Sequence, residues 1–333
     1  MTFTLRNLPQ TRKFTSYSPN TNSTSFHPSN RLSGRTCMIT GGSSGIGFSV
    51  AERFLNEGVG RIILVGRSYE RLVRAAKQLE RRDATSTLTG QSTVTAPEED
   101  LALDKRDDII SPPPSPGTLI DSSNQISLLV GDISQASTWT RELENAMAPV
   151  NILINAAGIS TSTVLPRTDP SDISQVLRTN LEGSLLTSRA LVRASIRTGM
   201  KTKDKNRAGD DSASAPSKCI INISSLLALK GGKGAVPYAA SKAGVLGLTR
   251  SLTVEASKTL RGQVIRVNAI VPGYIETPMI ADFTNNENAR LKEDIPLRRF
   301  GQPHEVADAA VFLAQNEYAN NCVINLDGGL SAL

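Results

Sequence analysis

The chain has 333 residues, of which 39% are hydrophobic and 20% are charged, the balance of a globular protein large enough for a sizeable core. Apolar runs are far shorter than the roughly 20 residues needed to cross a bilayer, so we expect no membrane span. Three scattered cysteines and two histidines offer neither a disulfide framework nor a zinc site, and we expect no bound metal.

The net charge of +6 is unevenly distributed along the chain. Five basic residues and no acidic residue precede Glu52, whereas bases and acids nearly balance after it. The basic excess therefore belongs to an amino-terminal arm, residues 1–35, and we do not expect the body to bind nucleic acid. The arm is rich in arginine, serine and threonine, which is typical of an organelle transit peptide. We expect a mitochondrial protein; a disordered arm on a cytoplasmic protein is the alternative.

The first elements after the arm predict a strand, a turn and a helix. "TCMITGGSSGIGFSVAERFLNEG" has a short apolar run, a glycine-rich turn and a helical spacing that ends at Gly58. "RIILVG" and "RSYERLVRAAKQLERR" predict the next strand and helix. Residues 83–124 are rich in serine, threonine and proline, and we predict a disordered surface insertion there.

The second half of the chain continues the alternation. Strands are predicted at "QISLLVGD", "VNILINAAG", "KCIINISS", "IRVNAIVPG" and "VINLDGG". Helices are predicted at "ASTWTRELENAM", around 173–199, after "GAVP" and at "PHEVADAAVFLAQ", with a second disordered insertion at 200–217 and a loop before the last helix. Near-continuous apolar strands alternating with helices indicate an α/β protein. We predict a single Rossmann-like, doubly wound parallel sheet over residues 36–333, with helices on both faces.

The glycine-rich turn "TGGSSGIG" predicts a phosphate-binding site. Gly41, Gly45 and Gly47 allow a sharp turn and a close backbone approach, and the helix that follows offers free N–H groups to a pyrophosphate. The spacing is G-x-x-x-G-x-G rather than the G-x-G-x-x-G of the standard dinucleotide motif. A tight turn without a ligand is the alternative.

The end of the second predicted strand indicates which dinucleotide would bind. An acidic residue there would bind the ribose 2′-hydroxyl of NAD, but the chain has Gly66-Arg67-Ser68. Arg67 can meet a phosphate, so we expect NADP(H). The alternative is an arginine that faces solvent.

One tyrosine and one lysine stand four residues apart in "GAVPYAASKAG". Residues at i and i+4 share a helix face, so Tyr238 and Lys242 can point into one cleft. Reduction of a carbonyl requires a proton donor beside its oxygen, and a nearby cation is expected to lower the pKa of a tyrosine toward neutrality. Ser225 follows a predicted strand and can donate a hydrogen bond to the carbonyl.

These features together resemble the short-chain dehydrogenase/reductase family over residues 34–333, apart from the insertions. The motifs that carry the resemblance are the glycine turn Thr40–Gly47, "NAAG" at 155–158, Asn180, Ser225, Tyr238-x-x-x-Lys242 and Pro272-Gly273. The resemblance implies that the catalytic residues are Asn180, Ser225, Tyr238 and Lys242. Together with the glycine turn and Arg67, the expected contacts of the cofactor are Gly41, Ser43, Ser44, Gly45, Ile46, Gly47, Arg67, Asp132, Ile133, Asn155, Ala156, Ala157, Gly158, Tyr238, Lys242, Pro272, Gly273, Ile275 and Thr277.

The resemblance also implies a role for several of these residues. Lys242 would bind the ribose hydroxyls, and Asn180 would hold a water that relays protons to it. Asp132 would contact the adenine, while Ile275 and Thr277 would contact the nicotinamide carboxamide. Two alternatives remain: Asn180 as a packing residue at a helix kink, and Asp132 as a helix N-cap.

Motifs near the carboxyl terminus resemble one subgroup of the family. "VNAIVPGYIETPM", "IPLRRFGQPHEVADAAVFLA" and "INLDGG" look like the 3-oxoacyl-[acyl-carrier-protein] reductases and the carbonyl reductase 4 group. This implies NADPH-dependent reduction of an acyl-carrier-protein-bound substrate in fatty acid synthesis, by a homotetramer or hetero-oligomer. Surface bases such as Lys233, Arg298 and Arg299 are candidates for meeting the acidic carrier. The alternatives are a reductase of free carbonyls, quinones or hydroxysteroids, and a non-catalytic subunit.

Two positions depart from the family pattern. The glycine turn has Ser44 where many NADPH-dependent members have arginine, and Asn320-Asn321 replaces a usual Thr-Gly turn. The first departure weakens the expectation of NADPH, and the second could alter assembly.

Overall fold

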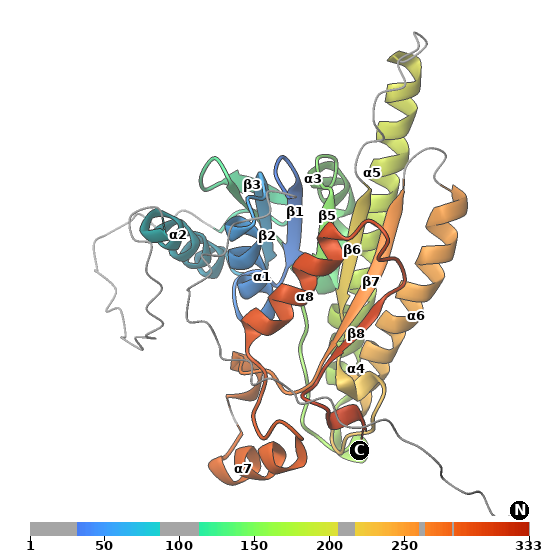
Figure 1. Cartoon of the computed structure of the whole chain (residues 1–333). Coiled ribbons are helices and arrows are strands. Elements are labelled where there is room, and N and C mark those ends of the chain that lie inside the picture. Colours follow the sequence, from blue (N-terminus) through green and yellow to red (C-terminus); the bar gives the residue numbers. More distant parts are fainter. Residues whose placement is uncertain (1–31, 87–112, 206–216, 260–263, 282, 333) are drawn as a thin grey trace, which may run out of the picture.

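The computed structural model describes residues 32–86, 113–205, 217–259, 264–281 and 283–332, and within them eight strands form one sheet (Figure 1). The strand order is β3-β4-β2-β1-β5-β6-β7-β8, parallel throughout except for β3, which pairs antiparallel with β4. The strands are β1 (Thr36–Thr40), β2 (Arg61–Gly66), β3 (Thr118–Asp121), β4 (Ile126–Val130), β5 (Ile152–Asn155), β6 (Lys218–Ile223), β7 (Ile265–Pro272) and β8 (Val323–Leu326).

Helices connect the strands and cover both faces of the sheet. The α-helices are α1 (Gly45–Asn56), α2 (Tyr69–Ser86), α3 (Thr140–Ala146), α4 (Pro170–Leu177), α5 (Gly183–Lys205), α6 (Val236–Thr259), α7 (Asn285–Asp294) and α8 (Pro303–Gln315). Short helices are η1 (Ile133–Trp139), η2 (Leu165–Arg167), the π-helix η3 (Arg178–Glu182), η4 (Leu226–Ala228), η5 (Pro278–Ile280) and η6 (Leu330–Ala332). None of the described helices combines the length and the apolar character that a membrane span requires.

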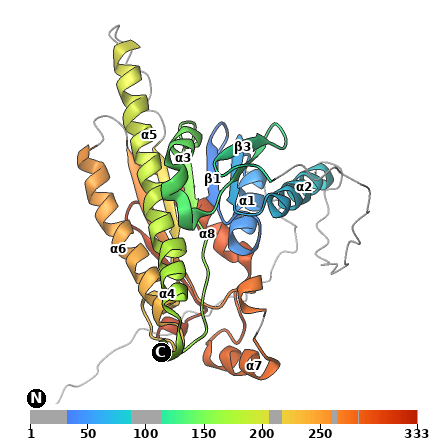
Figure 2. The same ribbon diagram turned by 180° about the vertical axis from the view of Figure 1, so that it is seen from behind.

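The two faces of the sheet have separate apolar cores. On one face α1, α2 and α8 pack through side chains such as Phe54, Leu72 and Val311 (Figure 1). On the other face α3, α5 and α6 pack through side chains such as Leu143 and Leu191 (Figure 2). Because both faces are covered, the central strands are apolar at consecutive positions, as in β2, where Ile62, Ile63, Leu64 and Val65 are all buried. The Rossmann-like fold predicted from the sequence is confirmed.

The boundaries of the predicted insertions and arm were partly wrong. α2 continues to Ser86, and β3 lies inside the first insertion expected at 83–124, adding an antiparallel edge to the parallel sheet. β3 is short and alternates in burial, so it lacks the apolar run by which the other strands were recognised. α5 extends to Lys205, into the second insertion expected at 200–217. The rest of both insertions, 87–112 and 206–216, lies outside the described residues.

The end of the amino-terminal arm belongs to the body. Leu32 is fully buried in the core of the α1 face, and Arg35 is 7% exposed. The domain therefore starts before the residue 36 that we predicted. Residues 1–31, on which the targeting prediction depends, lie outside the described residues.

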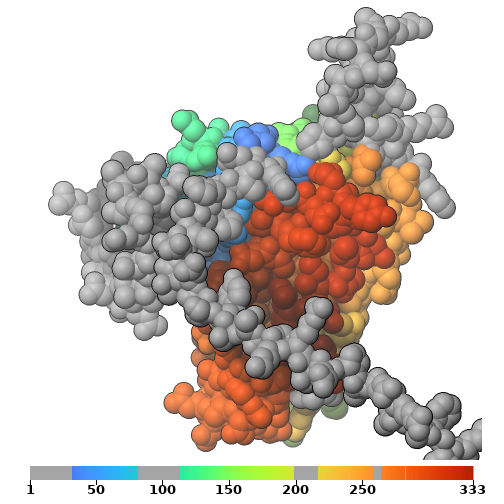
Figure 3. Space-filling view, in the orientation of Figure 1, coloured from blue at the N-terminus to red at the C-terminus, as the bar shows by residue number. Residues whose placement is uncertain are grey.

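Helix α7 was not predicted from the sequence. It follows the loop after β7 and contributes to the orange protrusion at the lower end of the body (Figure 3). Its start has a capping box, in which the Thr284 side chain accepts from Glu287 N and the Glu287 side chain accepts from Thr284 N. That Thr-x-x-Glu pattern was the sequence signal that could have revealed it.

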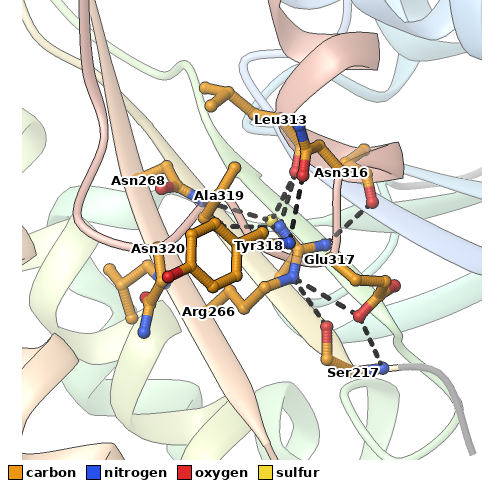
Figure 4. Close-up of polar contacts among 12 residues, drawn as sticks. Ser217, Arg266, Asn268, Leu313, Asn316, Glu317, Tyr318, Ala319 and Asn320 are labelled. Atoms are coloured by element: carbon orange, nitrogen blue, oxygen red, sulfur yellow. Dashed lines mark hydrogen bonds and ion pairs between the residues drawn. The ribbon is translucent and has the colours of Figure 1, made fainter.

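A buried arginine holds the end of α8 against β7 (Figure 4). Arg266 on β7 is 1% exposed, so its charge lies out of water. Its guanidinium donates to three carbonyl oxygens at 2.6, 2.9 and 3.0 Å, those of Leu313, Ala314 and Ala319. These carbonyls come from the last turn of α8 and the loop beyond, where the helix leaves acceptors unpaired.

The same network reaches both ends of the described chain. Glu317 lies 2.7 Å from Arg35 Nη2 and 3.6 Å from Arg266 Nε, so two arginines share one carboxylate (Figure 4). Arg266 Nε also donates to Ser217 Oγ at 2.7 Å. Burial raises the pKa of Glu317, but hydrogen bonds from Ser217 and Arg35 outweigh it and hold the pKa below its usual value.

The turn before β8 explains how Asn320-Asn321 can replace a Thr-Gly pair. Asn321 has φ of 58°, in the left-handed region that glycine accepts best and asparagine tolerates. Asn320 Oδ1 accepts from Val267 N at 2.9 Å, which ties the turn to β7. The backbone turn is therefore kept without glycine.

Candidate active site

The glycine turn joins the carboxyl end of β1 to the start of α1. Gly41 and Gly45 have φ of 69° and 56°, and a Cβ on Gly47 would lie 2.4 Å from Gly41 O. Ser44 stands at the N-cap of α1 but its side chain makes no cap hydrogen bond. The first N–H groups of α1 are therefore open to an anion beside the turn, while Ile46 lies within its first turn.

A cavity opens at the carboxyl ends of the strands, beside the glycine turn. Of the predicted cofactor contacts, its lining includes Gly41, Ser43, Ser44, Arg67, Asp132, Ile133, Ala156, Ala157 and Gly158. Residues that were not among the predicted cofactor contacts also line it: Thr40, Val65, Gly66, Ser68, Arg71, Gly131, Ile159 and Thr179. In open parallel sheets, ligands bind in this position because the strand ends and helix N-termini meet there.

Thr40 organises the wall of the cavity. Its Oγ1 accepts from the backbone N–H groups of Ala156 and Ala157, both at 3.1 Å. Asn155, predicted as a cofactor contact, instead points its side chain into the fold, where it donates to Asn222 Oδ1 at 2.9 Å and accepts from Thr187 at 2.7 Å. Asn155 is 3% exposed, so its side chain stabilises the interior beneath the 155–158 segment.

Asp132 caps a short helix at the same time as it lines the cavity. Its Oδ1 accepts from Ser134 N at 2.9 Å and from Ser134 Oγ at 2.8 Å, the N-cap of η1. The N-cap alternative is therefore correct, and the second carboxylate oxygen leaves capacity for a ligand.

Two adjacent serines after β6 have different surroundings. Ser224 Oγ donates to the backbone oxygen of Lys242 at 2.8 Å, which ties β6 to α6. Ser225 is the N-cap of η4, with its Oγ accepting from Leu227 N at 3.2 Å, and it also forms a side-chain hydrogen bond with Tyr238. The structure thus brings Ser225, and not Ser224, to the tyrosine.

Tyr238 and Lys242 lie together on α6, as their spacing predicted. Lys242 Nζ is 5.7 Å from the centroid of the Tyr238 ring and donates to Ile223 O at 2.8 Å. Burial lowers the pKa of Lys242 to about 8. Burial also raises the pKa of Tyr238, and the hydrogen bond with Ser225 only partly opposes it. This direction is opposite to the lowered tyrosine pKa that we expected, because removal of water from the phenolate dominates here.

Asn180 lies in the π-helix η3 between α4 and α5 and is fully buried. Its Oδ1 accepts from Ile159 N at 2.9 Å, and its Nδ2 donates to Ile159 O at 2.9 Å and to Ser241 Oγ at 3.0 Å. A Cβ on Gly158 would lie 3.4 Å from Asn180 Oδ1 and 3.3 Å from Lys242 Nζ, so both groups lie next to Gly158. Asn180 therefore has the packing role of the alternative and also lies next to the same glycine as Lys242.

The segment after β7 crosses toward the glycine turn. A Cβ on Gly273 would lie 2.8 Å from Asp327 Cα, so only glycine permits this approach. Ile275 is 6% exposed, and Thr277 Cγ2 lies 3.4 Å from the position of a Cβ on Gly45. Pro272 ends β7 at the same edge of the sheet. This places Thr277 beside the turn that opens α1.

The residues present fit a dinucleotide that carries phosphates. The uncapped N-terminus of α1 suits a pyrophosphate, and two arginines line the cavity. Lys242 lies next to the lining residue Gly158, and Tyr238 lies beside Lys242. A dinucleotide in this cavity would have its adenosine end near Arg67 and its reactive end toward Gly158 and the Tyr238–Lys242 pair.

Comparisons with known proteins agree with this geometry. A family model described as short chain dehydrogenase matches residues 35–103, and one described as enoyl-(acyl carrier protein) reductase matches residues 120–331. The chain is 34% identical over 296 residues to the 3-oxoacyl-[acyl-carrier-protein] reductase of Bos taurus, covering 89% of this chain and 98% of the relative. It is 39% identical over 184 residues to carbonyl reductase family member 4 of Danio rerio, covering 55% and 67%.

A solved structure has the same fold. The crystal structure of a putative NAD(P)-dependent gluconate 5-dehydrogenase from Beutenbergia cavernae, with bound NADP at low occupancy, has a TM-score of 0.69 and 25% identity, covering 92% of this chain and 100% of that one. With the fold, the Ser225–Tyr238–Lys242 cluster and these matches in agreement, the chain belongs to the short-chain dehydrogenase/reductase family of NAD(P)(H)-dependent oxidoreductases.

Proposed function

We propose that the protein is an NADPH-dependent reductase that converts 3-oxoacyl-[acyl-carrier protein] to 3-hydroxyacyl-[acyl-carrier protein]. The observation that carries the proposal is the buried cluster of Ser225, Tyr238 and Lys242, in which Lys242 lies next to Gly158, a residue of the cavity lining that also includes two arginines. Relatives named 3-oxoacyl-[acyl-carrier-protein] reductase, matched over nearly their whole length, support the choice of substrate.

The cluster can perform the proton side of a carbonyl reduction. NADPH, when bound, supplies the hydride. Tyr238 donates its phenolic proton to the carbonyl oxygen, and its raised pKa keeps that proton in place at neutral pH. The Ser225 hydroxyl donates a hydrogen bond to the same oxygen and so stabilises the negative charge that develops there. Lys242, with a pKa of about 8, carries a positive charge at neutral pH that favours the phenolate left behind.

An acyl carrier protein is acidic, so basic residues near the site would meet it. The Arg299 guanidinium already donates two hydrogen bonds to the Glu305 carboxylate, at 2.6 Å and 2.8 Å, which makes it less available to an acidic partner. Lys233 and Arg298 are exposed and remain the candidates for this contact. We also propose a mitochondrial location, on the composition of residues 1–35, and assembly into a homotetramer or hetero-oligomer.

One assay tests the proposed reaction. Purified protein is supplied with NADPH and acetoacetyl-carrier protein, and NADPH oxidation is followed. We expect turnover that falls by on the order of 10³-fold in Tyr238→Phe, since general acid catalysis contributes about 10²–10⁴-fold. Tyr69→Phe, which removes a phenol from α2 outside the cluster, is the matched control and should keep full activity. Equal activity of Tyr238→Phe and the wild type would exclude the proposed mechanism.

The substrate class is tested by the same preparation. Activity on acetoacetyl-carrier protein that exceeds activity on free ketones, quinones and hydroxysteroids supports the proposal. Activity confined to those free carbonyls would overturn it in favour of a general carbonyl reductase. A fusion of residues 1–36 to a fluorescent reporter tests the location, and a diffuse cytosolic signal would contradict it.

A further inference from the structure

We propose that Arg71 is a second specificity residue for the cofactor, which together with Arg67 binds the phosphate on the 2′-oxygen of the adenosine ribose. The inference rests on the proposed function only for the identity of the dinucleotide. Arg71 was not among the residues predicted from the sequence, and Arg67 alone carried that expectation.

The first turn of α2 aims Arg71 at the glycine turn. Arg71 N donates to Ser68 Oγ at 3.3 Å, so Ser68 acts as a cap and fixes the start of the helix. From there Arg71 Nη2 reaches across the cavity and donates to Ser44 Oγ at 3.2 Å. Its guanidinium therefore lies beside the glycine turn and lines the same cavity as Arg67.

Part of the cavity lining consists of hydrogen-bond donors and cations, namely Ser44, Arg67, Ser68 and Arg71. Among the described residues of the lining, the one acidic residue is Asp132, and its Oδ1 already accepts two hydrogen bonds from Ser134. A phosphate monoester has a charge of about −1.5 to −2 and three acceptor oxygens at neutral pH. Two guanidinium groups and two hydroxyls match that charge and number of acceptors. The free ribose hydroxyls of NAD carry no charge and would leave the two arginines without a partner of opposite charge.

Helix stability does not account for the position of Arg71. A cation in the first turn of a helix faces the positive end of the helix dipole, which is unfavourable. The hydrogen bond to the neutral Ser44 hydroxyl is too weak to explain the placement. An anion bound between Ser44 and the two arginines would offset the unfavourable interaction of Arg71 with the helix dipole. Arg71 would in turn supply, from α2, the positive charge that Ser44 does not supply from the glycine turn.

Nucleotide binding to the full chain tests the role of Arg71. NADPH and NADH are titrated into the wild type, Arg67→Ala, Arg71→Ala and the double variant, with affinity read from nicotinamide fluorescence. We expect Arg71→Ala to weaken NADPH at least about tenfold, or about 1.4 kcal/mol, while NADH changes less than about twofold. The double variant should lose most of the preference for NADPH. Arg71→Lys, which keeps a point charge but not the planar fork, should fall between Arg71→Ala and the wild type.

Arg74→Ala is the matched control. Arg74 is an exposed arginine one turn further along α2 and lies outside the cavity lining, so its loss should leave both affinities unchanged. An Arg71→Ala variant within about twofold of the wild type for NADPH, or one that weakens NADPH and NADH equally, would overturn the proposal.

These outcomes are separate from those of the reductase assay, because binding needs no carbonyl substrate. A protein that prefers NADPH through Arg71 but does not reduce a 3-oxoacyl thioester would keep this inference and lose the proposed substrate. A wild type that prefers NADH would overturn this inference whatever the substrate is.

Discussion

Arg266 and Lys242 are both cations that are almost completely buried, with exposures of 1% and 4%, but their surroundings differ. Arg266 donates to three backbone carbonyls and a serine hydroxyl and lies near a carboxylate. Lys242 donates to one carbonyl, and no carboxylate in the described part of the chain offsets the burial that lowers its pKa to about 8. The first cation has the partners that a structural role requires, whereas the second has capacity left for a ligand.

In this fold, the number of hydrogen-bond partners distinguishes a structural buried charge from a functional one. A guanidinium has five donors, and Arg266 uses its Nη1 and Nη2 groups to bind the last turn of α8 and the loop beyond it, while its Nε donates to Ser217. A buried ammonium group with unused donors beside a phenol destabilises the fold. Such a group can nevertheless bind a ligand and take part in a reaction. The two sites should therefore respond to substitution with opposite signs.

The largest effect on stability is expected at Arg266. Arg266→Met keeps much of the volume but leaves the carbonyls of α8 without donors and Glu317 without one of its partners. We expect the free energy of unfolding to fall by about 3–5 kcal/mol, measured by urea denaturation. Arg299→Met removes an exposed arginine paired with Glu305 and is the control, with a much smaller shift of the urea midpoint. A loss at Arg266 no larger than at Arg299 would mean that the network does not hold α8.

Replacing Lys242 should change the free energy of unfolding by less than replacing Arg266, and in the opposite direction. Its pKa lies below the ordinary value for lysine, so the folded protein binds its proton less readily than the unfolded chain does. The resulting destabilisation is complete below about pH 8 and is relieved as the pH rises from about 8 toward the ordinary lysine value.

Substitution of Lys242 tests this sign. Lys242→Met should raise the free energy of unfolding by about 1–3 kcal/mol at pH 6, with a smaller gain at pH 9, while abolishing turnover. Denaturation at the two pH values, compared with the wild type, measures the change. A variant less stable than the wild type at pH 6 would show that Lys242, like Arg266, is a structural cation.

The smallest effect is expected at Glu317, which is shared by Arg35 and Arg266 and has a side chain that is 49% exposed. Because its pKa is lowered in the fold, its carboxylate adds stability above the ordinary glutamate pKa, and this is lost as the pH falls through the folded value. Glu317→Gln should lower the free energy of unfolding by about 0.5–1 kcal/mol at pH 7, an amount reduced by solvent screening. In thermal denaturation the difference between the variant and the wild type should shrink as the pH falls below the ordinary glutamate pKa; a difference that does not shrink would mean that the carboxylate charge is not the cause.

Much of the site was predictable because its residues are tied to local patterns. The sequence predicted the glycine turn from its residue types, and it predicted the shared helix face of Tyr238 and Lys242 from their spacing of four. Helix α7 could also have been found from its capping box at Thr284. By contrast, β3 carries no apolar run, and only its pairing with β4 makes it a strand.

The sequence alone was enough to predict the order of most strands and helices and the identity of the groups at the strand ends, because periodicity and turn chemistry are local. The tertiary structure decided the direction of each side chain and the polarity around it. It turned Asn155 inward, brought Arg71 across to Ser44, and raised the pKa of Tyr238 where its neighbour in sequence predicted a decrease. These outcomes depend on burial and on contacts between residues far apart in the chain, which no local pattern contains.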